Sequence, residues 1–130
     1  MNLAYTGPVY FGTPLQTDGK DPEFVYDTGS GYLTTTSTVC SNCGTQYYDP
    51  ALSSSAEVVS EASKKLEYGS ATLVGYMGSD EVCVNEQTCV DDFQFFVITS
   101  SKGLNGNDGI LGMSPWDSLN GPSYMKALKD

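Results

Sequence analysis

The shortness of the apolar runs is the feature that most limits what this chain can fold into. Runs rich in β-branched and aromatic residues, such as 5–11, 23–27 and 93–99, are separated by clusters of Gly, Pro, Asn, Asp and Ser. Runs of this kind are typical of strands, and the clusters between them are typical of turns. With 130 residues, the chain has the size of one domain. The sequence therefore predicts a mostly antiparallel, all-β domain with short helices only.

A hairpin is predicted in the middle of the chain. Residues 65–68 and 72–76 have strand-like composition, and they flank Gly69 and Ser70. Glycine in so short a connection is typical of a β-hairpin turn. We therefore expect a hairpin near residues 66–84.

Other segments lack strand-like composition. We interpret residues 51–62, which include three consecutive serines, as a surface connection, and the Thr- and Ser-rich residues 34–38 as a loop. Residues 104–108 read as a Gly/Asn loop. Residues 122–129 predict one or two helical turns, because Pro122 suits a first turn.

The charged residues exclude several kinds of chemistry. The chain has no His and no Arg, its six cations are all Lys, and its net charge is −10. Without His there is no Ser-His-Asp or Cys-His nucleophile system and no imidazole metal ligand. The negative charge disfavours nucleic acid and anionic membranes, and no apolar run approaches the roughly 20 residues of a bilayer span. We expect no cofactor, no nucleic-acid partner and no membrane partner.

The four cysteines fall into two local pairs. Cys40 and Cys43 form a C-x-x-C, and five residues separate Cys83 from Cys89. Two structural disulfides in an exported protein, Cys40–Cys43 and Cys83–Cys89, are the simplest interpretation. A redox C-x-x-C and a four-cysteine zinc site remain alternatives, although the second pair lacks the tight spacing of a zinc knuckle.

The tetrapeptide Asp27-Thr28-Gly29-Ser30 is a candidate catalytic segment. An acid ends an apolar strand here and enters a loop that contains Gly and hydroxyl groups. Backbone N–H groups and a hydroxyl can keep such a carboxylate ionised and in place. Taken alone, the tetrapeptide is equally typical of an ordinary capped turn.

Its context resembles the pepsin-like aspartic proteases. Four motifs occur in that family's order and cover nearly the whole chain. They are the first strand ending in G-T-P at 12–14, F-V-Y-D-T-G-S at 24–30, the flap sequence L-E-Y-G-S at 66–70 and D-G-I-L-G-M at 108–113. Cys40 and Cys43 also stand where the family has its first small disulfide loop. The resemblance implies the N-terminal lobe of the acid protease fold, with a flap hairpin and a ψ-loop, over residues 1–130.

The resemblance also implies roles in the catalytic loop. Asp27 corresponds to one of two aspartates that activate a water molecule, one as base and the other as acid. Thr28 corresponds to the residue that bonds to its counterpart across the lobe interface. Gly29 lets the loop turn near the carboxylate, and Ser30 would hydrogen-bond its outer oxygen.

Further roles are implied in the flap and the ψ-loop. Tyr68, Gly69 and Ser70 correspond to the flap that closes over a peptide. Gly109 and Ile110 correspond to residues that support the catalytic loop from below. No metal takes part in this chemistry.

Two features depart from the family pattern. Thr34 stands where the family has the Trp that hydrogen-bonds the flap Tyr. There is also one D-T-G motif, not two, and we expect the C-terminal lobe and a signal peptide to be absent from these 130 residues. The second aspartate would then come from a missing C-terminal lobe or, less consistently with the disulfides, from a homodimer partner as in the retroviral proteases.

The expected function is therefore that of an aspartic endopeptidase lobe acting on peptide or protein substrates. As an isolated monomer it would be inactive, because the mechanism needs two carboxylates. The alternative is a truncated or non-catalytic pepsin-like domain that binds peptides or partners. The disulfides and the acidity of the chain suggest a secreted protein or one of an acidic, lysosome-like vesicle.

Overall fold

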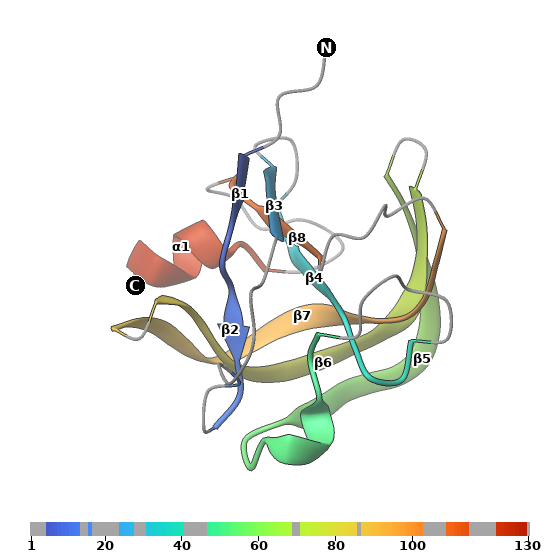
Figure 1. The fold of residues 1–130 in the computed structure, drawn as a ribbon, viewed down its shortest axis with the longest axis horizontal. Coiled ribbons are helices and arrows are strands. Elements are labelled where there is room, and N and C mark those ends of the chain that lie inside the picture. Colours follow the sequence, from blue (N-terminus) through green and yellow to red (C-terminus); the bar gives the residue numbers. More distant parts are fainter. Residues whose placement is uncertain are drawn as a thin grey trace.

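The computed structural model describes residues 5–13, 16, 24–27, 31–40, 47–68, 71–85, 87–102, 109–114 and 122–129. Within these ranges eight strands form one sheet, accompanied by two short helices (Figure 1). The strands are β1 Tyr5–Gly7, β2 Tyr10–Phe11, β3 Phe24–Asp27, β4 Leu33–Thr36, β5 Glu57–Tyr68, β6 Ala71–Asn85, β7 Thr88–Lys102 and β8 Gly109–Gly112. The helices are the 3₁₀ helix η1, Pro50–Leu52, and α1, Tyr124–Lys129. The predicted all-β class with short helices, including the helix near the end of the chain, is confirmed.

The sheet is curled, and the N-terminal segment bridges its two ends. Its strand order is β1-β3-β8-β4-β7-β6-β2, and β5 pairs with β6. Only Pro8 and Val9 separate β1 from β2, yet these strands pair at opposite ends of the order. Figure 1 shows β1 and β2 as one segment crossing the curled sheet. Pro8 has no N–H to donate to a ladder, which explains why the single predicted strand 5–11 is interrupted there.

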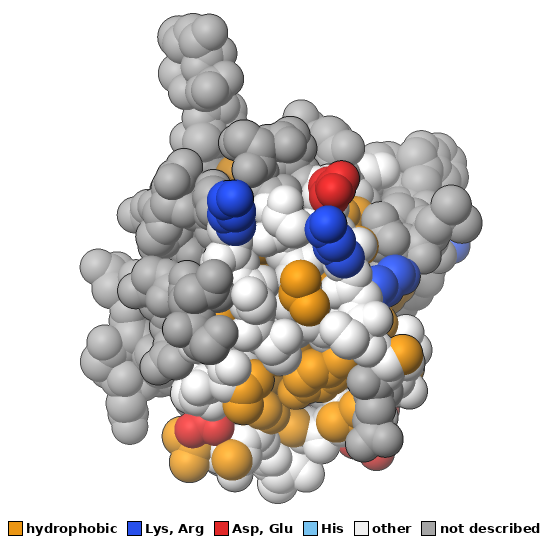
Figure 2. Space-filling view, turned by 90° about the vertical axis from the view of Figure 1, so that its right-hand side faces the viewer, with side chains coloured by type: hydrophobic (Ala, Val, Ile, Leu, Met, Phe, Trp, Pro, Cys, Tyr) orange, Lys and Arg blue, Asp and Glu red, His pale blue; other side chains and the backbone are white. Residues whose placement is uncertain are grey.

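The β5–β6 hairpin is the predicted one, but β5 is longer than expected. It begins at Glu57, so the interpretation of 57–62 as a surface connection is wrong. Its described side chains are exposed from Glu57 to Lys65, and Leu66 is the first buried one. Figure 2 views the molecule from the side on which β5 lies in Figure 1. Backbone pairing with β6, and not burial of side chains, holds this exposed part of β5 in place. Its composition is therefore polar, and the sequence did not identify it as a strand.

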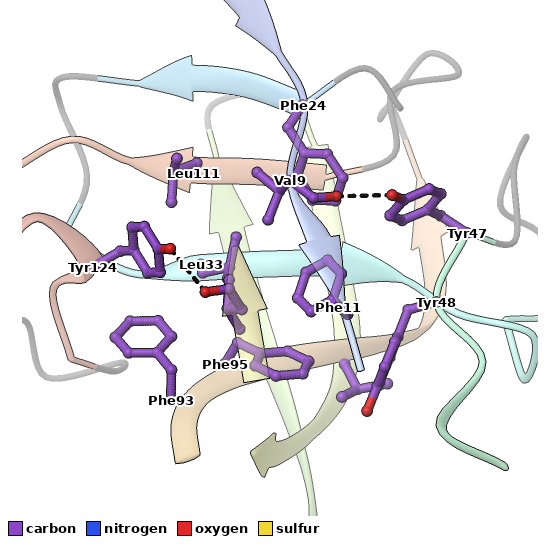
Figure 3. Packing of buried hydrophobic residues seen from close by; sticks show 12 residues of the cluster. Val9, Phe11, Phe24, Leu33, Tyr47, Tyr48, Phe93, Phe95, Leu111 and Tyr124 are labelled. Carbon is purple, nitrogen blue, oxygen red and sulfur yellow. Dashed lines mark hydrogen bonds between the residues drawn. The ribbon is translucent and has the colours of Figure 1, made fainter. Parts of the chain in front are cut away.

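The main core lies on one face of the sheet and is rich in aromatic rings. Phe11 packs against Phe24, Tyr48 and Phe95 with ring centroids 4.8–5.9 Å apart. Figure 3 shows these rings together with Val9, whose carbonyl accepts a hydrogen bond of 2.8 Å from the Tyr47 hydroxyl. The fully buried Val9 thus anchors the bridge between β1 and β2 in the core.

A second cluster lies on the opposite face of the sheet. Along β7 the side chains alternate, so that Phe95 and Val97 belong to the main core, whereas Phe96 and Ile98 belong to the second cluster. The second cluster consists of Tyr32, Cys40, Leu66, Leu73, Phe96, Ile98 and Ile110, with Val25 and Met77 packed against it. Burial on both faces explains why β7 is the most apolar strand in the sequence.

Strand β4 overturns the prediction of a loop at residues 34–38. Residues Thr34 to Ser37 are completely buried, and β4 lies between β7 and β8 in the interior of the sheet. Threonine is β-branched and favours extended backbone, so the segment can form a strand once its hydroxyls have partners. The predicted loop at 104–108 lies outside the described residues. No helix in the described part of the chain is long and apolar enough to cross a membrane.

Candidate active site

Strand β3 carries Asp27 at its carboxyl end. It lies between β1 and β8, with Tyr26 opposite Tyr5 and Asp27 opposite Gly112. Phe24 is fully buried, and the Tyr26 hydroxyl donates a 2.8 Å hydrogen bond to the Pro8 carbonyl, so both ends of this short strand are held. The Asp27 side chain and residues Thr28, Gly29 and Ser30 lie outside the described part of the structure.

Strand β8 is inserted between β3 and β4, which precede it by many residues in the chain. It pairs in parallel with β3 and antiparallel with β4. This is the ψ-loop arrangement that the motif at 108–113 implied, and that part of the fold prediction is confirmed. The insertion fixes β8 directly beside the strand that ends in Asp27.

Close backbone contact explains the glycine that begins β8. A Cβ atom on Gly109 would lie 2.1 Å from the Thr34 carbonyl oxygen and 2.7 Å from the Phe24 ring. Two further hydrogen bonds hold the strand. The Ile110 N–H donates to the Thr34 hydroxyl oxygen at 3.2 Å, and the Gly112 N–H donates to the Tyr32 carbonyl at 3.0 Å. Any larger residue at position 109 would push β8 away from both neighbours.

Thr34 therefore has a role that the sequence did not indicate. It is completely buried, and its hydroxyl oxygen accepts a hydrogen bond from the β8 backbone. The resemblance drew attention only to the Trp that this position lacks. The useful signal would have been the run of three consecutive Thr, which is unusual for a loop and compatible with a buried strand.

The flap hairpin shares the second cluster with the strands around Asp27. Leu66 and Leu73 pair across β5 and β6 and are both buried in that cluster. Val25 of β3 and Ile110 of β8 belong to the same cluster. The structure thus brings together the base of the β5–β6 hairpin and the paired strands β3 and β8, the first of which ends at Asp27. Tyr68 closes the β5–β6 ladder opposite Ala71, and its side chain, Gly69 and Ser70 lie outside the described residues.

A buried carboxylate ties the far end of the hairpin to the core. Asp80 is completely buried and accepts hydrogen bonds from the Tyr48 hydroxyl at 2.6 Å, the Ser53 hydroxyl at 3.0 Å and the Glu81 N–H at 2.7 Å, as well as from the Ser55 hydroxyl. Burial, followed by the hydrogen bond to Asp80, raises the pKa of Tyr48 well above its ordinary value. Four donors compensate the desolvation of Asp80, so we assign this group to the stability of the fold.

The three described cysteines are all disulfide-bonded. Cys83 and Cys89 lie opposite each other in the β6–β7 ladder and are bonded to each other, which is the local pairing that the spacing predicted. Cys40 is also disulfide-bonded, and Cys43 lies outside the described residues. Among the described residues, Glu81, Cys83 and Cys89 place potential ligand atoms within 4.8 Å of one another, but the disulfide occupies both sulfur atoms.

Comparison with known proteins identifies the family of this chain. The family model described as eukaryotic aspartyl protease matches residues 4–126, almost the entire chain. The chain therefore belongs to the eukaryotic aspartyl protease family. The pepsin-like resemblance of its motifs and the curled all-β fold agree with this result.

Individual relatives come from fungi and animals. Vacuolar protease A of Neurospora crassa is 33% identical over 119 residues, covering 87% of this chain and 29% of that protein. Gastricsin of Cavia porcellus is 34% identical and also covers 87% of this chain and 29% of its own length. Aspartic protease 3 of Caenorhabditis elegans is 32% identical and covers 91% of this chain and 31% of its own length. The chain thus spans about three tenths of the length of these relatives.

Proposed function

We propose that residues 1–130 are the N-terminal lobe of an aspartic endopeptidase and supply one of its two catalytic carboxylates, Asp27. The observation that carries the proposal is the position of Asp27 at the end of β3, opposite Gly112 of the inserted strand β8. An inserted strand that is packed and hydrogen-bonded on both sides can hold an acidic loop rigidly, as catalysis requires. Membership of the aspartyl protease family supports this assignment.

The proposed reaction is hydrolysis of a peptide bond by a water molecule held between two carboxylates. One ionised carboxylate takes a proton from the water, and the protonated one hydrogen-bonds the peptide carbonyl oxygen. Thr28, Gly29 and Ser30 would hold Asp27 in place, and Gly109 and Ile110 would support that loop through β8. Tyr68, Gly69 and Ser70 would close over the substrate. The chemistry involves no cofactor and no metal.

The second carboxylate must come from outside the one D-T-G segment of this chain. We propose a second lobe as its source, because the chain corresponds to about three tenths of each relative. A second copy related by two-fold symmetry is the alternative source, since symmetry would bring two Asp27 residues together. The protein would work in a secreted or acidic vesicular setting.

The test is acid proteolysis by the protein as it is naturally produced. We expect cleavage of an unfolded protein substrate at acidic pH, inhibition by a pepstatin-type transition-state analogue, and loss of activity by at least about 10³-fold in Asp27→Asn. Asp91→Asn, an exposed acid on β7, is the matched control and should leave the rate unchanged.

Two outcomes would count against the proposal. Pepstatin-resistant cleavage that survives Asp27→Asn would exclude Asp27 as a catalytic residue. Absence of cleavage combined with retained peptide binding would favour the second candidate, a non-catalytic pepsin-like domain that binds peptides.

A further inference from the structure

Exposed apolar side chains gather where η1 meets the start of β5. Among the described residues, only four large hydrophobic side chains are highly exposed, and three of these belong to this region: Leu52 at 66%, Val58 at 55% and Val59 at 45%. The fourth, Val39, lies on a different segment of the chain. Single exposed apolar residues are ordinary, but a cluster of them marks an interaction surface.

A groove of about 290 Å³ is lined in part by one of these side chains, Val58. Its walls come from the segment around η1 and from the start of β5, and its floor comes from β6 and β7. The lining residues are Tyr48, Pro50, Ala51, Ala56, Glu57, Val58, Tyr76, Gly78 and Val97. None of these residues belongs to β3 or β8, so the groove is separate from the proposed catalytic site. The lining is mostly apolar, with Glu57 as its one charged residue, which suits one or two aliphatic or aromatic side chains.

Lysines lie farther along the same strands. Lys64 and Lys65 are exposed on β5, and Lys102 is exposed on β7. Lys102 lies opposite Thr72 of β6, which in turn lies opposite Glu67 of β5. Three of the six lysines of a chain with net charge −10 thus lie toward the same end of the β5–β6–β7 part of the sheet. Figure 2 shows lysine side chains above a band of hydrophobic ones on this side of the molecule. One pair, Lys65 and Glu67, is a weak surface contact of 3.9 Å.

Strand β5 also offers backbone hydrogen-bonding groups. Within the described part of the chain it pairs only with β6, and no described strand occupies its other edge. An open edge can accept an extended peptide as an additional strand. The apolar groove lies near the beginning of β5 and the lysines near its end, so a peptide along this edge would meet both.

We propose that this surface, formed by η1, β5, Lys102 and the groove, binds an extended peptide of a partner protein with an apolar segment followed by acidic residues. The apolar side chains enter the groove beside Val58, and the acidic ones lie near Lys64, Lys65 and Lys102. A second copy of this chain is a poorer occupant because two chains of net charge −10 repel each other.

The experiment uses the naturally produced protein and a fluorescein-labelled peptide, Ile-Thr-Phe-Thr-Val-Asp-Glu-Asp-Glu. Fluorescence anisotropy should show saturable binding with a dissociation constant of about 10–100 µM that weakens as salt is added. The same peptide with Lys in place of each acid should bind at least about tenfold more weakly.

Variants then locate the binding surface. The double variant Lys64→Glu/Lys65→Glu and the single variant Val58→Asp should each weaken binding at least about tenfold while leaving the far-UV circular dichroism unchanged. Lys126→Glu, an exposed lysine on α1, is the matched control and should leave binding within about twofold.

Three results would overturn the proposal. The first is the absence of saturable binding at peptide concentrations up to about 1 mM. The second is binding that the β5 variants do not change, or that a pepstatin-type inhibitor displaces, because the peptide would then occupy the catalytic cleft. The third is concentration-dependent self-association, seen by sedimentation and abolished by Lys64→Glu/Lys65→Glu, because a second copy would then be the occupant.

Discussion

Strands β4 and β7 lie side by side in the sheet and are both buried where they pair, yet their sequences have little in common. They pair in parallel, with Thr34 opposite Phe96 and Thr36 opposite Ile98. All of these residues are completely buried. The β7 segment was recognised as a strand from its apolar run, whereas the Thr-rich β4 segment was interpreted as a loop.

Hydrogen bonds explain how β4 tolerates its burial. The Thr34 hydroxyl oxygen accepts from the Ile110 N–H, and the Thr36 hydroxyl oxygen accepts from the Tyr47 N–H at 3.2 Å. Just beyond the strand, the Ser37 hydroxyl donates to the Ile98 carbonyl at 2.9 Å. A buried polar strand is therefore stable where its neighbours supply partners, whereas β7 gains its stability from apolar area removed from water.

The largest loss of stability is expected from shortening a buried aromatic side chain of β7. Phe96→Ala should lower the free energy of unfolding by about 3–5 kcal/mol, because it removes apolar contacts and leaves a cavity in the second cluster. Urea unfolding followed by circular dichroism would measure it. A loss below about 1 kcal/mol would mean that the cluster can collapse around the smaller side chain, and that β7 depends less on packing than we infer.

A smaller loss of stability is expected from removing one hydrogen bond of the buried network around Asp80. Tyr48→Phe removes one of the four donors to the buried Asp80 and should lower the free energy of unfolding by about 1.5–3 kcal/mol. Tyr10→Phe is the control, because the Tyr10 hydroxyl makes no hydrogen bond within the described part of the chain, and it should lose less than about 0.5 kcal/mol. Equal losses in the two variants would argue against a special contribution from the Tyr48–Asp80 bond.

The same tyrosine predicts a pH dependence. Burial, then the bond to Asp80, raises the Tyr48 pKa above the ordinary value of 10.0, so the folded state favours the protonated phenol. The contribution of Tyr48 to the free energy of unfolding is therefore fully present below pH 10. It is lost as the pH rises above 10 toward the raised pKa of the folded state. Denaturant titrations from pH 8 to pH 11 should show stability falling above pH 10, and falling less steeply in Tyr48→Phe. Parallel curves for the two proteins would contradict this assignment.

Replacing a β4 hydroxyl with a methyl group tests the strand directly. Thr34→Val keeps the shape and the extended backbone but leaves the Ile110 N–H without its side-chain partner, so we expect a loss of about 1–2 kcal/mol. Thr34→Ser retains the acceptor and should recover part of the hydrogen-bond contribution. Amide hydrogen exchange at Ile110 distinguishes the two, since only Thr34→Val should accelerate it. Unchanged exchange in Thr34→Val would show that the hydroxyl does not hold β8.

The smallest effect is expected at an irregularity within β7 itself. Between the pairs Asp80–Phe93 and Val82–Val90, β7 has two residues and β6 only one, so Asp91 and Asp92 form a β-bulge. Asp92 has a φ of 52°, in the left-handed region that favours glycine. Asp92→Gly should therefore stabilise the protein by up to about 1 kcal/mol. Asp91→Gly is the matched control and should destabilise it by about 0.5–1 kcal/mol, and gains of equal sign in both would contradict the role of φ.

The candidate site was predicted from motifs that are local in the chain. The D-T-G-S segment, the flap sequence around Tyr68 and the D-G-I-L-G-M segment each depend on residues that are adjacent in the chain. Their order along the chain indicated the family, and the family comparison supports it. Residues whose importance comes from distant partners were missed. Thr34 is defined by a contact with Ile110, 76 residues away, and Asp80 by donors from Tyr48, Ser53 and Ser55.

The sequence by itself determined the β class, the position of the flap hairpin, the short helix near residue 124 and the segment that carries Asp27. These follow from local backbone preferences, from turn residues and from motifs read along the chain. Only the tertiary structure decided that Thr34 to Ser37 are buried, that Asp80 is enclosed by four hydrogen-bond donors and that β5 continues back to Glu57 along an exposed face. Whether a polar residue is buried or exposed depends on the partners that folding brings to it, and those partners come from strands far away in the chain.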